Sequence, residues 1–376
     1  MSAEPRSNRR LIFRLLAAVF AGAMVVRLFS AAPQAGAVAS KGEDDELLRT
    51  VAPPRSPYVK RALIVSIDGL RPDLLLRART PNLRGLMGRG SYSMWARTTE
   101  MSITLPSHTS MLSGVTPENH RIVWNHYIAN IFPDVPTIFE LAHKAGYTTA
   151  LVSGKTKFHE LCRPGSVQFV DVFWETASRK VGPDLDTADA ACGILRRHNP
   201  DLMFVHLGQT DETGHAIGWG TPQQIAAIER ADAAVGMVLS TYREMGVLDE
   251  MLVIVSADHG GQGKGHGPND PRSRHIPWIA AGPGIKRDFD LTRHADLVVN
   301  TEDTFATACH LLRISVPHKV DGRFVKQILE AADPADKPKT AKKKTDPPDA
   351  PKDDEYTPWE APPYKPEWER VEIRHH

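Results

Sequence analysis

Acidic residues follow three short apolar runs of this sequence. They are Asp68 after ALIVSI, Asp211 shortly after LMFVHL, and Asp258 after MLVIVSA. Continuous apolar runs of this length are typical of strands buried on both faces of a parallel sheet. Because ligands of an open α/β sheet bind outside the carboxyl ends of its strands, three strands would bring these acids to one edge.

Histidines accompany two of these acids. His215 lies four residues after Asp211, on the same face if this segment forms a helical turn. His259 follows Asp258 directly, and His266 lies further along the same glycine-rich segment. The pool of carboxylates and imidazoles is large enough for two divalent metal ions. Ligands of this kind without thiolates favour Zn²⁺, with Mn²⁺ or Fe²⁺ as alternatives.

Residues 99–112, TEMSITLPSHTSML, carry six hydroxyl groups that could act as a nucleophile. Pro106 fits the first turn of a helix that ends at Gly114. A hydroxyl just before that helix would lie at the positive end of its dipole, where an alkoxide and a phosphoryl group are favoured. Thr104 is therefore the first candidate and Ser107 the second. Two metals about 3.5–4 Å apart could clamp an in-line displacement at phosphorus.

Several segments resemble the alkaline phosphatase superfamily, and within it the type I phosphodiesterases of the nucleotide pyrophosphatase/phosphodiesterase group. They are IVSIDGLRPDLL, TPNLRGL, TEMSITLPSHTSMLSGVTPENHRIVWN, PTIFELAHKAGYTTALVS, DETGH and SADHGG, within residues 60–325. The resemblance implies a nucleophilic Thr104 and a phosphoryl-binding Asn125. It also implies two metal sets: Asp68, Thr104, Asp258 and His259 in one, and Asp211, His215 and His266 in the other, with His275 as the fallback for His266.

The sequence departs from the larger phosphodiesterases of this family at the glycine-rich loop. A long insertion there forms a cap over the substrate, whereas His259 and His266 are only seven positions apart in this sequence. We therefore expect no large cap domain and a more open site. Lys155 and Lys157 resemble the paired lysines of phosphonoacetate hydrolases, which implies that they bind a second anionic group of the substrate.

Apolar strand-like runs alternate with helix-like stretches across residues 58–332, and this pattern predicts an α/β domain with a mostly parallel sheet. The expected strands are 62–67, 148–153, 202–207, 251–256 and 276–281, and the clearest expected helices are 137–146 and 222–246. The family resemblance implies an alkaline phosphatase-like three-layer α/β/α sandwich.

The two ends of the chain differ in composition from this domain. Residues 1–37 have a basic head, a twelve-residue apolar middle and an Ala35-Gly36-Ala37 cleavage motif, which predicts a signal peptide or an uncleaved N-terminal anchor. Residues 38–57 are expected to be a linker. The segment 333–376 is rich in Pro, Lys and acids, and is expected to be a disordered tail. We therefore expect an exported protein that is periplasmic, secreted or membrane-anchored.

The charge and cysteine content of the chain limit which binding partners and disulfides we expect. The chain has 376 residues and a formal charge of +1, which gives no electrostatic indication of nucleic-acid binding. Its three cysteines allow one disulfide at most. The expected function is hydrolysis of a small phosphodiester or pyrophosphate through a phospho-threonine intermediate. The alternatives are a phosphomonoesterase or phosphonate hydrolase and, less favoured, a non-catalytic exported binding protein.

Overall fold

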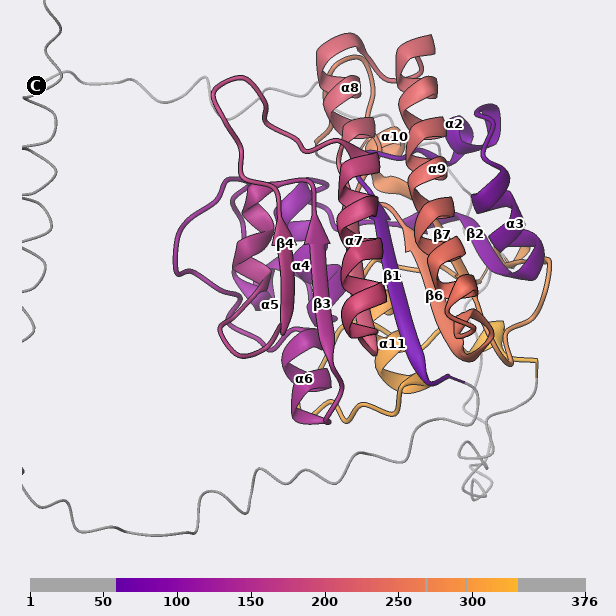
Figure 1. Ribbon diagram of the computed structural model, residues 1–376. Helices are drawn as coiled ribbons and strands as arrows, with labels where there is room; N and C mark the ends of the chain where they lie inside the picture. Colours follow the sequence, from indigo (N-terminus) through magenta and orange to yellow (C-terminus); the bar gives the residue numbers. More distant parts are fainter. Residues whose placement is uncertain (1–58, 268–269, 295, 331–376) are drawn as a thin grey trace, which may run out of the picture. The chain divides into compact units, whose positions relative to one another are not determined.

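The central element is an eight-stranded sheet with the strand order β4-β3-β5-β1-β6-β7-β2-β8 (Figure 1). The strands are β1 (Arg61–Ile67), β2 (Gly90–Arg97), β3 (Thr149–Ser153), β4 (Phe169–Val172), β5 (Leu202–Leu207), β6 (Met251–Ser256), β7 (His275–Ala281) and β8 (Phe289–Asp290). The computed structural model describes residues 59–267, 270–294 and 296–330. The predictions for the signal segment, the linker and the tail lie outside these residues.

Five neighbouring strands, from β4 to β6 in the sheet, run parallel. β7 is antiparallel to both β6 and β2. In the register, Ile67 of β1 lies beside Leu207 of β5, and Ser66 of β1 lies beside Ser256 of β6. The three central strands therefore end at the same level, which we call the carboxyl edge of the sheet. The opposite side, where these strands begin, is the amino edge.

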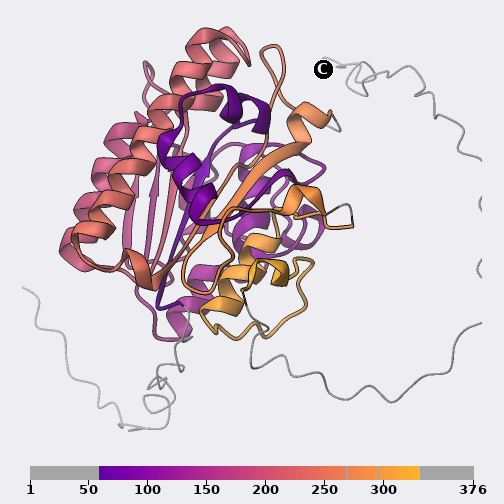
Figure 2. The same cartoon turned by 90° about the vertical axis from the view of Figure 1, so that its right-hand side faces the viewer.

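Helices cover both faces of the sheet (Figure 2). α2 (Pro72–Arg77), α3 (Pro81–Arg89), α7 (Asp184–His198) and α9 (Pro222–Glu244) pack on one face. α4 (Thr104–Ser113), α5 (Pro117–His120), α6 (Ile138–Lys144) and α11 (Asp303–Leu311) pack on the other. The short helices α8 (Gln209–Ile217) and α10 (Pro271–Arg274) lie near the carboxyl edge, at the top of Figure 1. This is the predicted three-layer α/β/α sandwich.

The predicted strands agree with the structure to within one residue because their side chains are buried on both faces. β1, β5 and β6 are buried along almost their whole length. We did not predict β2, β4 or β8. β2 (GSYSMWAR) and β4 (FVDV) mix polar with apolar side chains and carry exposed positions, and β8 has only two residues.

The described residues also bear on the expectations for disulfides and for membrane-spanning helices. Cys162, Cys192 and Cys309 are all free thiols. No helix among the described residues combines the length and the apolar character needed to cross a membrane.

Candidate metal centre

Two of the predicted acids lie beside each other at the carboxyl edge. Asp68 directly follows β1, and its backbone N–H donates to the carbonyl of Leu207 at the end of β5 (2.9 Å). Asp258 lies two residues beyond β6, and its Oδ1 accepts a hydrogen bond from the backbone N–H of Gly69 (3.1 Å). Because β1 lies between β5 and β6, the strand order itself brings these carboxylates together.

The third acid belongs to a compact group with two histidines. Asp211 lies in the first turn of α8, and His215 follows one turn later, as the spacing predicted. His215 Nε2 is 3.4 Å from Asp211 Oδ1. His266 Nε2 is 3.7 Å from the same oxygen and 3.1 Å from His215 Nε2. The three side chains each present one ligand atom, and these atoms lie within 4.8 Å of one another, so they could hold one metal ion.

A second group lies next to the first. Asp68, Asp211 and His259 also bring ligand atoms within 4.8 Å of one another. His259 Nε2 is 3.3 Å from Asp68 Oδ1 and 3.2 Å from Asp258 Oδ2. Asp211 belongs to both groups, so the structure places two candidate metal positions side by side.

The backbone fixes the orientation of all three imidazoles. Each ring places Nδ1 within hydrogen-bonding distance of a carbonyl oxygen: His215 with Lys264 (3.0 Å), His259 with Gly260 (2.8 Å) and His266 with Ser102 (2.8 Å). A carbonyl only accepts hydrogen bonds, so Nδ1 carries the proton and the lone pair lies on Nε2. This outer hydrogen bond is the arrangement that metal-binding histidines normally show.

Four buried polar atoms at the centre of this cluster have no hydrogen-bond partner. They are Asp68 Oδ1, Asp211 Oδ1, Asp258 Oδ2 and His259 Nε2. Leaving such atoms buried and unpaired is costly, and buried charges in proteins are normally paired or bound to metals. The residues therefore fit divalent cations, and their oxygen and nitrogen donors suit Zn²⁺.

The electrostatics of the cluster are those of closely spaced buried acids. Burial, together with the charge of Asp68, raises the pKa of Asp258 well above its usual range. Burial also disfavours the charged form of Asp68, but Lys155 and a hydrogen bond with His206 outweigh it and lower the pKa of Asp68. Burial and the nearby His266 lower the pKa of His259 to about 4, so this imidazole is neutral at pH 7.

The candidate nucleophile Thr104 is the first residue of α4 rather than the residue before it, and Pro106 lies in the first turn as predicted. Its side chain is buried, with 1% of the residue exposed. His108 joins this turn to the cluster, because its Nδ1 is 2.8 Å from the Thr104 carbonyl oxygen and 3.5 Å from Asp258 Oδ2. The first turn of α4 therefore lies close to a candidate metal ligand.

Four of the other hydroxyls in residues 99–112 have structural hydrogen bonds. Ser102 donates to Gly267, Ser107 to the carbonyl of Asp258, and Thr109 to Leu105, while Ser110 bonds with His120. Ser107, the second candidate, is thus used to hold the loop after β6. These contacts favour Thr104 over Ser107 as the reacting hydroxyl.

Asn125 lies beside the first turn of α4. Its Oδ1 accepts a hydrogen bond from the backbone N–H of Leu105 (3.0 Å), the residue that follows Thr104. Lys157 Nζ donates to the same Oδ1 (2.9 Å) and to the Asn125 carbonyl (2.6 Å). Burial, with the charge of Lys155, lowers the pKa of Lys157 to about 8.

Lys155 reaches the candidate metal ligands themselves. Its Nζ is 2.6 Å from Asp68 Oδ2 and 2.7 Å from Asp211 Oδ2. Burial would lower the pKa of Lys155, but the charges of Asp211 and Asp68 outweigh it, and the pKa is raised above its ordinary value. The sequence predicted that this lysine lies near the site, but not that it contacts Asp68 and Asp211.

Three residues that support the site were not singled out from the sequence for this role. His206 Nε2 is 2.9 Å from Asp68 Oδ2, and His108 Nε2 is 2.7 Å from the Ser66 hydroxyl. Trp219 donates its indole N–H to the Gly69 carbonyl, and a Cβ on Gly261 would clash with its ring. The only signals in the sequence were a histidine inside an apolar strand (LMFVHL) and another inside a buried helix.

His275, the fallback ligand, lies outside both groups of candidate ligands. It begins β7 and stacks on the exposed ring of Trp95, with the ring centroids 3.7 Å apart. The structure therefore brings His266, and not His275, to Asp211 and His215.

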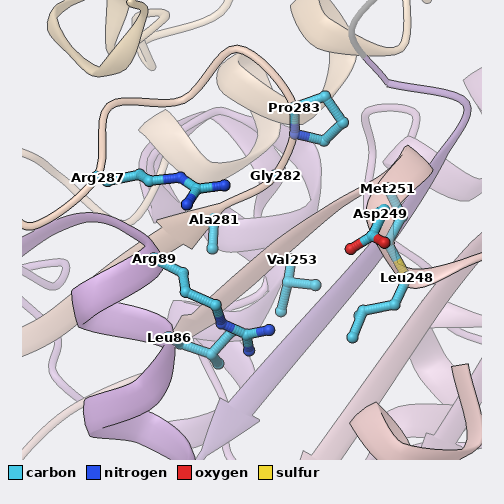
Figure 3. Close-up of a pocket in the computed structure, with 10 residues that line it drawn as sticks. All are labelled: Leu86, Arg89, Leu248, Asp249, Met251, Val253, Ala281, Gly282, Pro283 and Arg287. Atoms are coloured by element: carbon cyan, nitrogen blue, oxygen red, sulfur yellow. The ribbon is translucent and has the colours of Figure 1, made fainter. Parts of the chain in front are cut away.

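A groove at the amino edge of the sheet has a different character (Figure 3). It is lined by Leu86, Arg89, Leu248, Asp249, Met251, Val253, Ala281, Gly282, Pro283 and Arg287. This lining has no histidine and a single carboxylate, so it lacks the donor set found at the carboxyl edge.

Known proteins resemble this chain in sequence. An uncharacterised pyrophosphatase/phosphodiesterase of Schizosaccharomyces pombe is 24% identical over 220 residues, which are 54% of this chain and 45% of that protein. The chain spans less than half the length of this relative.

Solved structures share the fold. Mouse ectonucleotide pyrophosphatase/phosphodiesterase 5, an inactive threonine-to-alanine variant in complex with AMP, superposes with a TM-score of 0.60 at 16% identity, covering 72% of this chain and 100% of that one. The phosphonate monoester hydrolase of Agrobacterium radiobacter gives a TM-score of 0.56 at 16% identity, covering 73% and 78%. The sheet and its two helical layers are therefore those of the alkaline phosphatase-like fold.

A family profile described as type I phosphodiesterase / nucleotide pyrophosphatase matches residues 62–267. This region contains all the residues of both candidate metal groups, together with Thr104 and Asn125. Since the match covers more than half of the 376 residues, the chain belongs to the type I phosphodiesterase / nucleotide pyrophosphatase family.

Proposed function

We propose that this protein is a metal-dependent hydrolase that cleaves phosphodiester or pyrophosphate bonds of small, nucleotide-like substrates. The observation that carries the proposal is the set of four buried, unpartnered donor atoms beside the N-terminal turn of α4. Buried polar atoms without hydrogen-bond partners destabilise a fold, so four of them at one point favour a role in binding cations.

Two metal ions, most suitably Zn²⁺ with Mn²⁺ or Fe²⁺ as alternatives, would be held by the two sets of side chains. One set is Asp68, Thr104, Asp258 and His259, and the other is Asp211, His215 and His266. When bound, the metals would lower the pKa of the attacking hydroxyl and neutralise charge on the phosphoryl oxygens.

In this proposal Thr104 is the nucleophile and Asn125 binds a phosphoryl oxygen. The Thr104 oxygen attacks phosphorus opposite the leaving group, the bond to the leaving oxygen breaks, and the hydroxyl proton passes to solvent. The Asn125 amide N–H₂ donates to a non-bridging oxygen as charge develops there. Water then cleaves the phospho-threonine, which restores the hydroxyl and releases the product.

The names of similar proteins support a diester or pyrophosphate substrate. The fission yeast relative is described as a pyrophosphatase/phosphodiesterase, and the mouse structure contains AMP. The inactive mouse variant lacks a threonine, which agrees with a threonine nucleophile in this chain.

A phosphomonoesterase or phosphonate hydrolase is the second candidate. The shared fold of the phosphonate monoester hydrolase and the short loop between His259 and His266 favour it, because a site without a large cap restricts the substrate less. A non-catalytic binding protein is less consistent with the site, since each expected ligand position holds a competent side chain.

We also propose that the protein is exported. Residues 1–37 carry the basic head, apolar middle and small-residue motif of a signal segment. Mass spectrometry of the mature N-terminus from a cell fraction tests this, since a cytoplasmic protein that begins at Met1 would contradict it.

A substrate panel tests the proposed reaction. We expect turnover of bis-p-nitrophenyl phosphate and of a nucleotide p-nitrophenyl ester to exceed that of p-nitrophenyl phosphate and phosphonoacetate. A preference for the monoester or the phosphonate would favour the second candidate.

The Thr104→Ala variant tests the nucleophile. Its activity should fall by about 10³-fold or more, because the proposed nucleophile is removed. Thr109→Ala is the matched control, since Thr109 lies in the same helix and donates to the Leu105 carbonyl. Near-normal activity of Thr104→Ala would contradict the mechanism.

A further inference from the structure

The two lysines of the segment that follows β3 differ from free substrate-binding cations in their contacts. Lys155 has 7% of its surface exposed, and its ammonium group lies between two carboxylates. Lys157 donates to two oxygens of Asn125. Both ammonium groups are therefore occupied by protein groups that the proposed mechanism uses.

The two oxygens of each carboxylate have different surroundings. Lys155 contacts Oδ2 of Asp68 and Oδ2 of Asp211. Oδ1 of Asp68 and Oδ1 of Asp211 are buried without a hydrogen-bond partner. The lysine thus occupies the outer oxygens and leaves the inner oxygens available to the candidate metals.

The position of Lys155 is fixed by the surrounding backbone. Its N–H donates to the Ser153 hydroxyl (3.1 Å), and the N–H of Gly154 donates to the carbonyl of His206 in β5 (3.2 Å). A Cβ built on Gly208 would lie 3.5 Å from Lys155 Cε, so the side chain runs close to the turn before α8. These contacts direct the ammonium group to the gap between β1 and α8.

Lys157 has the corresponding effect on Asn125. The amide oxygen accepts from both Lys157 Nζ and the Leu105 N–H, which accounts for both of its lone pairs. Because the amide group is planar, its N–H₂ must be turned to the opposite side. This leaves the N–H₂ group available to donate to a phosphoryl oxygen.

We propose that Lys155 and Lys157 are positioning residues that hold the side chains of the proposed active site in place, and that neither contacts the substrate. Lys155 ties Asp68 of one metal set to Asp211 of the other, and Lys157 sets the orientation of Asn125. This role, which rests on the proposed function, differs from the substrate-binding role that the family resemblance implied for these lysines.

The most direct test is a crystal structure of the wild-type, Zn²⁺-loaded protein with inorganic phosphate. We expect Lys155 Nζ to remain within hydrogen-bonding distance of both carboxylates, and Lys157 Nζ to remain on Asn125. Direct contact of either ammonium group with a phosphate oxygen would overturn the proposal.

Thermal unfolding of metal-free protein gives a second test that does not depend on turnover. Removing one partner of a buried ion pair is strongly destabilising, so Lys155→Met should lower Tm by about 10 °C. The deficit should shrink in saturating Zn²⁺, which would compensate the two carboxylates. Lys180→Met is the control, because that lysine is exposed beside Glu175. An unchanged Tm for Lys155→Met would contradict a positioning role even if the protein is not a phosphodiesterase.

Steady-state kinetics separate the two roles for Lys157. If it positions Asn125, Lys157→Met should lower kcat by about tenfold for diester and phosphonoacetate alike, with KM within about twofold. An increase in KM confined to phosphonoacetate would show instead that the lysine binds a second anionic group of the substrate.

Discussion

Buried carboxylates at the two edges of the sheet differ in whether all their oxygens have partners. At the amino edge, Asp201 Oδ2 accepts hydrogen bonds from both the backbone N–H and the hydroxyl of Thr148, and Oδ1 lies 3.7 Å from Arg61. At the carboxyl edge, Asp68 and Asp258 each keep one buried oxygen without a hydrogen-bond partner. The first arrangement stabilises the fold, whereas the second costs stability unless a cation binds. The contrast agrees with the proposed cation site at the carboxyl edge.

The groove of Figure 3 strengthens this contrast. It lies at the amino edge and offers a mainly apolar lining with Arg89 and Arg287. A concave shape alone therefore does not identify the reactive site in this fold. The candidate chemistry lies where several buried carboxylate and imidazole atoms without hydrogen-bond partners cluster together.

Exchanging one acid at each edge should produce the largest contrast. Asp258→Asn should lower phosphodiester hydrolysis by about 10²-fold or more, since a candidate metal ligand is lost. The metal-free variant should be more stable than wild type, because burial and Asp68 already disfavour the charged form of Asp258. Initial rates and chemical unfolding of chelator-dialysed protein measure the two effects.

Asp201→Asn is the matched variant at the amino edge. It should leave activity within about twofold and lower the free energy of unfolding by about 1–2 kcal/mol, because its hydrogen bonds to Thr148 are weakened. The comparison between the edges would be broken if Asp201→Asn lost activity while Asp258→Asn retained it.

Two histidines give the next largest contrast. His266→Asn should lose one of two bound metal equivalents and about tenfold or more of the activity, since even outer partners of metal ligands contribute about 10–100-fold. His275→Asn should retain both metals, because His275 stacks on Trp95 outside the cluster. Metal analysis of the two purified variants checks this, and loss of metal from the His275 variant alone would reverse the assignment.

The smallest predicted effect on the candidate site is at buried Glu302, whose substitution should change stability but not metal content. Burial raises its pKa from 4.5 to about 7. Between these values the folded protein binds more protons than the unfolded chain, so the free energy of unfolding falls as pH rises, by about 3 kcal/mol in total. Glu302→Gln should flatten the stability profile between pH 4.5 and 7 without changing metal content. A profile identical to that of wild type would show that this carboxyl does not titrate as described.

The sequence predicted the central strands and the acids at their ends for the same physical reason. Strands buried on both faces appear as uninterrupted apolar runs, and the residues that follow parallel strands must meet at one edge. The proximity of Asp211 and His215 could be predicted because residues four apart lie on the same face of a helix. The edge strands β4 and β8 are short, and β2 and β4 carry exposed positions, so they left no comparable pattern.

The supporting contacts were not predictable from one sequence because they depend on side chains that meet through tertiary packing. His206 and His108 lie in buried elements, and nothing in their spacing indicated which carboxylates they approach. Lys155 was expected near the site from the resemblance, but its contacts with Asp68 and Asp211 follow from the direction of its side chain after β3.

The central claim is that the unpaired atoms at the carboxyl edge form a two-metal hydrolytic site. Its most direct test is the metal content of wild-type protein dialysed against Zn²⁺, measured together with bis-p-nitrophenyl phosphate hydrolysis before and after chelation. We predict two equivalents of Zn²⁺ per chain, loss of activity with the chelator, and recovery when Zn²⁺ is restored. A folded protein that binds no metal, or one that hydrolyses the diester equally well without it, would contradict the account.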